Sequence, residues 1–361
     1  MMIVRLFSVF LLSIVIIACD PFHTTFKKSE HPRYFQSASL SDIPTSGDPL
    51  TLMTWNIKFG GARIDFFFDC HGDEVLMTKT ETESNLAALA TIINDIRPDI
   101  LFLQEADIGS KRSAYVNEVQ WLLDHTELNY AVYASQWHAD FVPSDGIGPV
   151  DSGNAIFSRW PLNDGERIAL PEISAQDTLT RYFYLKRNML KASINLSSGN
   201  TLHLLNTHLA AYAQDDTVQK QLNQLLAEMN TMDTDNLHFI AGGDFNTLPP
   251  GSTQSKDFAD NVCTGEDFLA DDFSEKLDLL TPFYQAYTPA VSLADFQSDN
   301  NPYLTHSVSG SVFWNRKIDY LFTNTGFVNA STRVYQNVSN GGYETMPLSD
   351  HAPMSVQWSI P

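Results

Sequence analysis

The 361-residue sequence is poor in cysteine and in basic residues. It has three cysteines and no CxxC pair, and the spacing of these cysteines excludes the usual cysteine-based zinc sites. Its 22 lysines and arginines stand against 43 aspartates and glutamates, which gives a formal net charge of −21. A chain this acidic lacks the basic stripe of a tight nucleic-acid binder. A nuclease stays open as a hypothesis, because metal ions can bridge a phosphate to an acidic pocket.

The sequence also lacks a second linker, an internal repeat and a low-complexity block from about residue 45 onward. With 43% hydrophobic and 12% aromatic residues, this part of the chain can bury a large core. We therefore predict one catalytic domain over residues 49–361, and we expect it to be a monomer.

The amino-terminal residues resemble a bacterial lipoprotein signal peptide. Arg5 precedes a short apolar stretch that ends at Ala18, directly before Cys19. In this interpretation residues 1–18 are removed and Cys19 carries a lipid, which anchors the protein to a membrane of the cell envelope. The alternatives are a plain secretory signal and a transmembrane anchor, although the apolar stretch is short for a membrane span.

Residues 19–48 are rich in Ser, Thr, Pro, His and Lys and show neither helical nor strand periodicity. We interpret them as a polar tether, with an ordered extension that wraps the domain as the alternative. Once the signal peptide is removed, Cys70 and Cys263 remain. They form either one disulfide or two free buried thiols, and the sequence does not decide between these.

Apolar runs and helical periodicity predict nine strands and three helices. The strand runs cover residues 50–56, 99–104, 130–135, 153–158, 188–196, 201–207, 237–242, 318–322 and 352–358, and the helix patterns cover residues 83–96, 114–124 and 217–229. This order favours an α/β fold with two mixed sheets and helices on their outer faces over a purely parallel doubly wound sheet. Residues 251–311 are rich in Asp, Ser and Asn and are predicted to be a long loop with a functional surface.

Five apolar runs end in a polar residue of the kind that binds metal or phosphate. Together they bring the side chains of Asn56, Glu105, His208, Asp244, Asn246, Asp350 and His351 to strand ends. Because open α/β folds place ligands at the rim of a sheet, we expect these side chains to meet there. Carboxylate and amide oxygens suit a hard cation such as Mg²⁺, and imidazole groups suit a phosphate ester. The pattern predicts one active site.

Most of these residues also have a structural interpretation. Asn56, for example, can be a turn residue whose side chain caps the local backbone. Glu105 beside Asn56 can hold a divalent ion, but a strand-end acid can equally form a surface salt bridge. In AGGDFN, Asp244 can orient or deprotonate a water and Asn246 can donate to a phosphate oxygen, whereas an Asx-turn would use the same residue types. His208 can donate to phosphoryl oxygens, or serve as a structural hydrogen-bonding residue.

Asp319 lies inside an apolar strand signal, where an unpaired charge is unfavourable. We predict that it pairs with His351, because a carboxylate raises the pKa of an imidazole and fixes its tautomer. The alternative is a surface pair with Lys317 or Arg316.

The motifs TWN, QE, NTHL, GGDFN, KIDY and SDH, in this order and at these separations, resemble the endonuclease/exonuclease/phosphatase superfamily. The resemblance covers roughly residues 50–358 and implies a four-layer α/β sandwich. It also implies cleavage of a phosphate ester with Mg²⁺, with Mn²⁺ or Ca²⁺ as other candidates. Its implied metal ligands are Asn56, Glu105 and Asp350. Its implied catalytic residues are Asp244, Asn246, His208, His351 and Asp319.

One segment departs from the superfamily pattern, namely the insert ARIDFFFDCHGDE, with three consecutive phenylalanines at positions 66–68. These rings are predicted to fill the core, with a substrate or membrane contact as the alternative. Its acids, among them Asp65, Asp69 and Asp73, do not have the spacing of a calcium loop. Arg112 and Arg187 are candidate phosphate clamps, or members of surface ion pairs.

Three functional hypotheses follow. The first is a lipid-anchored, Mg²⁺-dependent hydrolase of a lipid or small-molecule phosphoester, favoured because the protein is acidic and carries a predicted membrane anchor. The second is a secreted or surface nuclease that cleaves DNA or RNA. The third is a binding protein without catalysis on the same fold, which predicts decayed motif positions. All six motifs keep reactive residue types.

Overall fold

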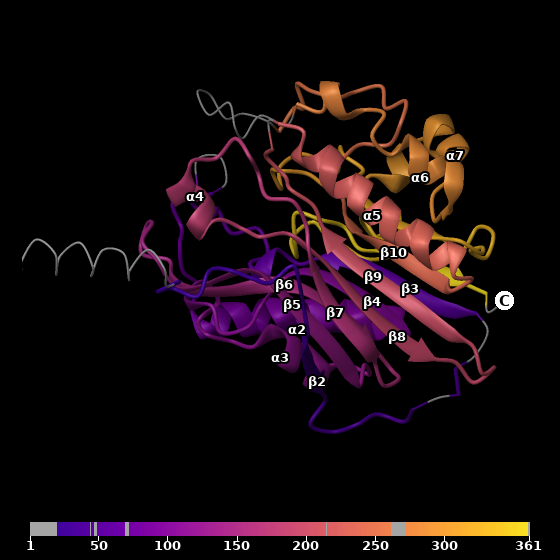
Figure 1. Ribbon diagram of the computed structural model, residues 1–361, viewed down its shortest axis with the longest axis horizontal. Coiled ribbons are helices and arrows are strands. Elements are labelled where there is room, and N and C mark those ends of the chain that lie inside the picture. The colour runs from indigo at the N-terminus through magenta and orange to yellow at the C-terminus, as the bar shows by residue number, and fades with distance from the viewer. Residues whose placement is uncertain are drawn as a thin grey trace, which may run out of the picture.

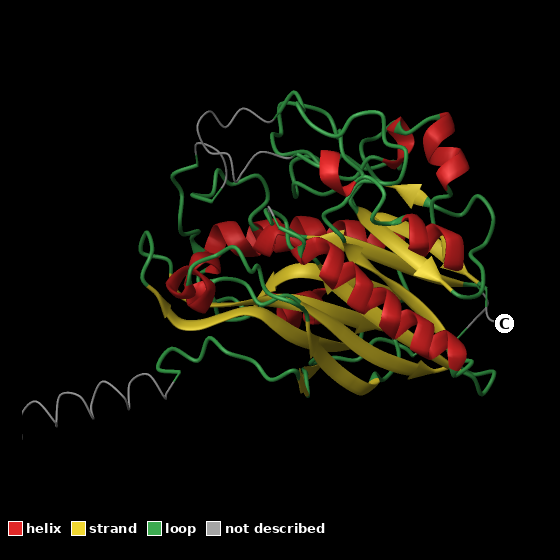
Figure 2. Ribbon diagram, turned by 45° about the horizontal axis from the view of Figure 1, so that its top comes forward, coloured by secondary structure: helices red, strands yellow, loops and turns green. Residues whose placement is uncertain are grey.

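The computed structural model describes residues 20–43, 45–46, 49–68, 72–213, 215–260 and 272–359. Two mixed sheets of seven strands each pack face to face, and helices cover their outer faces (Figures 1 and 2). The first sheet has the order β1 (Ser29–Glu30), β7 (Asn163–Ala169), β8 (Asn188–Asn195), β9 (Thr201–His208), β10 (His238–Asp244), β12 (Asp319–Thr323) and β11 (Thr288–Pro289). The second has the order β13 (Arg333–Val334), β14 (Met354–Trp358), β3 (Leu50–Asn56), β4 (Ile100–Asp107), β6 (Gly148–Ser158), β5 (Tyr130–Val142) and β2 (Arg33–Gln36).

Three long or medium helices form the outer layers. α2 (Lys79–Ile96) and α3 (Glu118–His125) pack on the second sheet, and α5 (Thr217–Thr234) packs on the first. A capping box of Thr78 and Glu81 starts α2, which satisfies backbone N–H groups that the first turn leaves unpaired. The predicted four-layer α/β sandwich is confirmed, with the main apolar core between the two sheets.

The nine predicted strands are all present, several of them longer than predicted. The predicted helix at residues 114–124 is wrong at its start, because Ala114 and Tyr115 adopt positive φ angles of 53° and 61° and the helix begins only at Glu118. The predicted loop at 251–311 contains short elements, namely α6 (Thr281–Ala286), α7 (Leu293–Ser298) and β11. α4 (Thr178–Phe183) and β7 were not predicted, since neither has a clear apolar period.

The interpretation of residues 19–48 as a tether is wrong for residues 20–43. β1 pairs with β7 at the edge of the first sheet, and β2 pairs with β5 at the edge of the second. This segment is therefore an ordered extension that reaches both sheets. Such edge pairing relies on main-chain hydrogen bonds, so a polar sequence without periodicity can form it. Cys19, Asp69, Cys70 and Cys263 lie outside the described residues, and the predictions about lipid attachment and a disulfide remain predictions.

In the described part of the chain, no helix has the length and apolar character needed to cross a bilayer.

A buried polar contact joins the two sheets behind the strand ends. Gln104 of β4 donates from Nε2 to Oδ1 of Asn206 in β9 at 2.7 Å. Asn206 Nδ2 in turn donates to the carbonyl oxygens of Leu103 and Ala155, each at 2.8 Å. These bonds fix the position of one sheet against the other next to the predicted site.

The glycine pair of AGGDFN allows β10 to lie close to both of its neighbours. A Cβ on Gly243 would lie 2.0 Å from the carbonyl oxygen of Thr207, and the φ of Gly243 is 124°, a value that favours glycine. We expect Gly243→Ala to destabilise the fold by about 1–3 kcal/mol or more, as overpacking does. Urea unfolding measures this change.

Gly326 provides the control for this prediction, because nothing lies within 4 Å of a Cβ added there. Gly326→Ala is expected to change stability by less than about 0.5 kcal/mol. Equal stability of Gly243→Ala and the native chain would contradict the proposed close approach of β9 and β10.

Candidate active site

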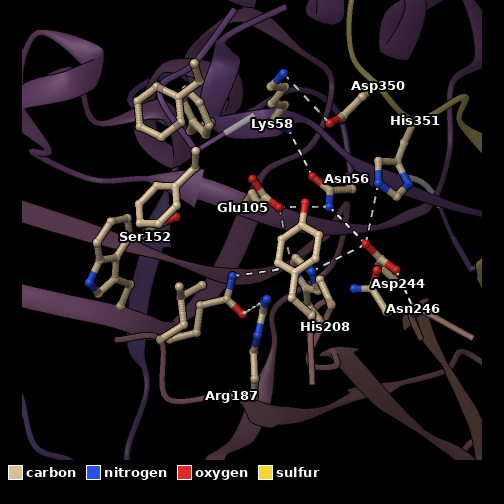
Figure 3. A pocket seen from close by; sticks show the side chains of 18 of the residues that line it. Asn56, Lys58, Glu105, Ser152, Arg187, His208, Asp244, Asn246, Asp350 and His351 are labelled. Carbon is tan, nitrogen blue, oxygen red and sulfur yellow. Dashed lines mark hydrogen bonds and ion pairs between the residues drawn. The ribbon is translucent and has the colours of Figure 1, made fainter. Parts of the chain in front are cut away.

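The predicted side chains meet in one pocket where β3, β4, β9 and β10 end (Figure 3). The pocket has a volume of about 160 Å³, which is roughly the volume of five water molecules in the liquid. Seven of the eight predicted catalytic and metal-binding residues line it, namely Asn56, Glu105, His208, Asp244, Asn246, Asp350 and His351. Asp319 does not line the pocket; it lies in contact with His351.

Strand register explains why residues far apart in the sequence come together. β9 and β10 are parallel and place His208 opposite Asp244, while the antiparallel β12 places Asp319 opposite Asp244 from the other side. In the second sheet, the parallel strands β3 and β4 place Asn56 opposite Gln104, next to Glu105. Because the sheets are packed face to face, the two rows of polar groups face a common pocket.

Several residues that line the pocket have a left-handed backbone conformation. Glu105 has a φ of 59° and lies in the register shift of β4 between Leu103 and Ala106. Such an irregularity turns a side chain away from its regular alternation. Positive φ angles of 45° at Lys58 and 46° at Asn246 accompany it. The same conformation occurs at residues outside the pocket, such as Arg97 and Ala114, so here it describes how the strand ends turn toward the pocket and does not identify an active site by itself.

Asp244 is the most highly connected group in the pocket. Its Oδ1 accepts the backbone N–H of Asn246 at 2.9 Å, and its Oδ2 accepts Nδ2 of Asn56 at 3.1 Å. Nε2 of His208 lies 3.4 Å and Nε2 of His351 lies 3.5 Å from the same Oδ2. Burial, with a contribution from the nearby Asp319 carboxylate, raises the pKa of Asp244 to about 7, against the opposing effect of His351. This carboxyl group can therefore take up or release a proton near neutral pH.

Asp319 contacts His351 as the sequence predicts. Nδ1 of His351 lies 2.9 Å from Oδ2 of Asp319, and both side chains are buried. The alternative partners are engaged elsewhere: Arg316 forms a salt bridge with Asp260, and Nζ of Lys317 donates to the main-chain oxygen of Asp319. Burial alone would lower the pKa of His351, but the carboxylates of Asp319 and Asp244 outweigh it and raise this pKa to about 10. His351 is then protonated at neutral pH.

His208 is oriented by a residue that the sequence analysis missed. Nε2 of Gln136 lies 3.4 Å from Nδ1 of His208, while Oε1 of Gln136 accepts a hydrogen bond from Nη1 of Arg187 at 3.2 Å. An amide nitrogen can only donate, so Nδ1 of His208 is the acceptor and Nε2 carries the proton that points at Asp244. Gln136 lies in a register shift of β5, and the signal for it was a lone amide inside an apolar strand.

Glu105, Asp350 and Asn56 form the oxygen-rich side of the pocket. Burial, and then the charge of Asp350, raises the pKa of Glu105. Lys58, also missed from the sequence, places its Nζ 3.9 Å from Oδ2 of Asp350. The side-chain oxygen of Asn56 accepts the backbone N–H of Lys58 at 3.0 Å, and its amide nitrogen donates to Glu105 at 3.2 Å.

The carboxylates of Glu105 and Asp350, together with the amide oxygen of Asn56, are the kinds of oxygen ligand that a hard divalent cation prefers. The closest groupings of nitrogen and carboxylate ligand atoms in the described chain are His306, Asp350 and His351, and Asp244, Asp319 and His351. Of the predicted ligands, only Asp350 belongs to either grouping. His306 is a further pocket residue without a sequence signal, since it lies in a segment predicted to be a loop.

The two candidate phosphate clamps differ. Arg112 is buried, forms a bidentate ion pair with Asp107 at 2.8 and 2.9 Å, and stacks over Phe59 at 3.7 Å. The alternative of a surface ion pair is wrong, because Arg112 is buried. Arg112 also lines the pocket, and its role as a phosphate clamp remains a prediction. Arg187 lines the pocket, and its buried Nε has no hydrogen-bond partner among the described residues. An anion in the pocket would satisfy this group.

The three phenylalanines of the insert are divided between core and pocket. Phe66 is buried in a small apolar cluster, as predicted for core filling. Phe68 remains 38% exposed and stands edge-on to Trp137 with ring centres 6.1 Å apart. Phe66, Phe68 and Trp137 all line the pocket, so one of its walls is aromatic.

A two-sheet α/β sandwich with carboxylate, amide and imidazole groups gathered at the strand ends defines a phosphoesterase-type hydrolase fold. Residues 53–351 match the model of the Endonuclease/Exonuclease/phosphatase family, and the chain belongs to this family. The family contains nucleases, phosphatases and phosphodiesterases, and its fold typically uses a divalent metal. The resemblance inferred from the six motifs is thereby confirmed.

Solved structures of low sequence identity share the fold. An endonuclease/exonuclease/phosphatase from Beutenbergia cavernae is 15% identical with a TM-score of 0.54, over 87% of this chain and 72% of that one. The catalytic domain of human Nocturnin, solved with a bound sulfate anion, is 16% identical with a TM-score of 0.51, over 91% and 98%. A conserved protein of unknown function from Enterococcus faecalis is 15% identical with a TM-score of 0.52, over 86% and 100%. A search of curated proteins finds no match.

Proposed function

We propose that this protein is a divalent-metal-dependent phosphodiesterase that acts on a lipid or small-molecule phosphoester. The observation that supports this most is the position of Asp244. Its carboxylate contacts Asn56, His208 and His351 in the same pocket that holds Glu105 and Asp350. A base, protonated donors and cation ligands around one cavity are the groups that hydrolysis of a phosphate ester needs.

Each group has a role in the proposed hydrolysis. Asp244 accepts the proton of the attacking water, whose oxygen forms a new bond to phosphorus. The bond between phosphorus and the leaving oxygen breaks, and protonated His351 donates its Nε2 proton to that oxygen. His351 cannot act as the base at neutral pH because its pKa is raised to about 10. Asp319 holds the imidazolium through Nδ1.

The remaining groups bind the phosphoryl oxygens. His208 donates from Nε2, Asn246 from its amide, and Arg187 from its guanidinium. A divalent ion held by Glu105, Asp350 and the oxygen of Asn56 would stabilise the negative charge that develops on the phosphoryl group.

Three features support a lipid or small-molecule phosphoester over nucleic acid. The chain carries a formal net charge of −21, and its amino terminus predicts a lipid anchor in the cell envelope. The aromatic wall with Phe68 and Trp137 suits an apolar substrate group beside the phosphate. A nuclease is the second candidate, favoured by the family to which the chain belongs. The candidate without catalysis is disfavoured, since the pocket keeps every proposed reactive group.

A panel of phosphoesters with Mg²⁺ tests the proposal: sphingomyelin, an inositol phosphate, plasmid DNA and an aryl phosphodiester. We expect turnover of a lipid or small-molecule ester with weak salt dependence. A nuclease would instead cleave the plasmid, and its substrate affinity would fall steeply as salt rises. Absence of hydrolysis across the panel with Mg²⁺, Mn²⁺ and Ca²⁺ would remove the proposed catalytic function.

Removal of the metal is expected to abolish hydrolysis reversibly. EDTA should reduce the rate to background, and excess Mg²⁺ should restore it. Calorimetric titration of the metal-free chain should show a site that Glu105→Gln weakens at least tenfold, because one charged ligand is lost. Glu83→Gln, a half-exposed residue of α2 that pairs with Lys79, serves as the control and should leave the affinity unchanged.

A further inference from the structure

The chain enters the domain beside α4, and this entry point is fixed by several contacts. Tyr182 of α4 donates to Oδ1 of Asp20, and the backbone N–H of Thr25 donates to Oδ2 at 2.7 Å. Asp140 of β5 donates its N–H to the carbonyl oxygen of Phe22 at 2.9 Å. The ring of Phe22 lies 5.6 Å from that of Phe183. Asp20 is therefore held against the domain and is not at the end of a mobile tether.

α4 exposes an apolar surface that nothing in the described chain covers. None of the residues of α4 is buried, which is unusual for a helix of a globular protein, and Leu179 is 70% exposed. Phe141, whose ring centre lies 6.4 Å from Phe22, is 48% exposed. Figure 1 shows α4 at the opposite end of the molecule from α6 and α7. Exposed apolar side chains that cluster in this way mark an interaction surface. We call Phe22, Phe141, Leu179 and Phe183 the α4 face.

The α4 face is continuous with the aromatic wall of the active-site pocket. Nε1 of Trp137 donates to the carbonyl oxygen of Phe183 at 2.7 Å, and Trp137 meets Phe68 at the pocket. Residues 184, 185 and 187, directly after α4, also line the pocket. The segment that follows α4 therefore leads directly from this face to the pocket.

We infer that the α4 face docks on a lipid bilayer, with the pocket mouth turned toward the membrane surface. Cys19, the predicted site of lipid attachment, is one residue before Asp20, and consecutive Cα atoms are 3.8 Å apart. A lipid on Cys19 would enter the bilayer within a few ångströms of α4, since Asp20 is bound to Tyr182. The bilayer must then lie against this face, where exposed Leu and Phe side chains can enter the interface between headgroups and acyl chains.

Three carboxylates near this face are hydrogen-bonded within the protein. Asp20 accepts a hydrogen bond from Tyr182, and Asp140 accepts one from His23 at 2.6 Å. Asp177 accepts hydrogen bonds from backbone N–H groups in the first turn of α4. Docking also has a consequence for the substrate, which rests on the proposed function. The substrate would be a membrane lipid, and its headgroup phosphate would enter the pocket while the lipid stays in or close to the bilayer.

Depth-dependent quenching tests the docking without any need for hydrolysis. The full chain, processed in a bacterial host and with Cys70→Ser and Cys263→Ser, is given one cysteine, Leu179→Cys or the control Val338→Cys, which is 71% exposed in the loop between β13 and β14. An environment-sensitive fluorophore on this cysteine is measured in phosphatidylcholine vesicles that contain spin-labelled lipid. We expect at least threefold stronger quenching at position 179 than at position 338. Equal quenching, or a chain that stays out of the membrane fraction, would overturn the inference.

A second measurement uses chains that keep both internal cysteines. Leu179→Glu should slow hydrolysis of a vesicle-embedded phosphoester at least tenfold and leave hydrolysis of a soluble aryl phosphodiester unchanged. Val338→Glu should change neither rate. If Leu179→Glu loses activity on both substrates, or keeps full activity on both, docking through α4 is contradicted.

Absence of hydrolysis in the native chain would refute only the proposed function, because the quenching experiment would still report the orientation at the membrane. Capture of α4 by an envelope protein instead of lipid would show as cross-links from position 179 without quenching, and would also overturn the inference.

Discussion

Asp244→Asn is expected to reduce kcat/KM for a phosphodiester by about 10³- to 10⁴-fold, the upper range for loss of a general base in a fixed geometry. The side chain keeps its size, but the amide cannot accept the proton of the attacking water. The effect should be largest near neutral pH and above, where the native carboxyl, with its pKa raised to about 7 by burial, is ionised. Rate measurements from pH 5 to 9 test this expectation.

The native enzyme provides the pH signature for comparison. Activity should rise as pH passes through about 7 while Asp244 loses its proton, and it should fall near pH 10 while His351 loses its own. Higher Mg²⁺ should move the acid limb to lower pH, because an added cation favours the ionised carboxylate. Asp235→Asn, an exposed residue at the end of α5, is the control and should keep the native profile. If the activity of Asp244→Asn still rises through about pH 7 as in the native enzyme, another group is the base.

The positions of the site residues could be predicted from the sequence because they follow long apolar strands. Asn56, His208 and Asp244 each close such a strand, and the register of the sheets then brings them together. Strand identity depends on local patterns of apolar residues, which are visible in one sequence. The order of the strands and their packing could be inferred from the resemblance of six motifs, not from periodicity.

Other residues of the site could not be predicted, because their roles depend on tertiary contacts. Gln136 lies in an irregular part of β5, and only the arrangement of Arg187 and His208 gives it a function. Arg112 has the side chain of a phosphate ligand, yet its Nε and Nη2 both donate to the buried carboxylate of Asp107. The bulge that turns Glu105 into the pocket could not be predicted either, because the apolar run of β4 continues through it without a change of pattern.

The amino-terminal extension shows the same limit on a larger scale. A polar segment without periodicity has the composition of a tether, and the alternative was an extension packed on the domain. Its two short strands are stabilised by main-chain pairing at open sheet edges, which composition does not report. A tether would leave the start of the domain free, whereas the hydrogen bond from Tyr182 holds Asp20 against α4.

His351→Ala is expected to reduce kcat by about 10²- to 10⁴-fold through loss of the general acid. Asp319→Asn should act through His351, because Asp319 supplies much of the charge that raises the imidazole pKa to about 10. We expect the alkaline limb of the Asp319→Asn profile to move to lower pH, while the acid limb moves to lower pH by a smaller amount, since Asp319 also raises the pKa of Asp244.

The double variant distinguishes a shared role from two separate ones. If Asp319 acts only by orienting and charging His351, then His351→Ala with Asp319→Asn should be hardly slower than His351→Ala alone, because residues that act as one unit are strongly non-additive. Multiplicative losses would mean that Asp319 contributes to catalysis by another route. Its Oδ1, which is buried and accepts no hydrogen bond from the described residues, would then be the atom to investigate. Thermal unfolding of all three variants, expected to remain cooperative, separates these kinetic effects from loss of the fold.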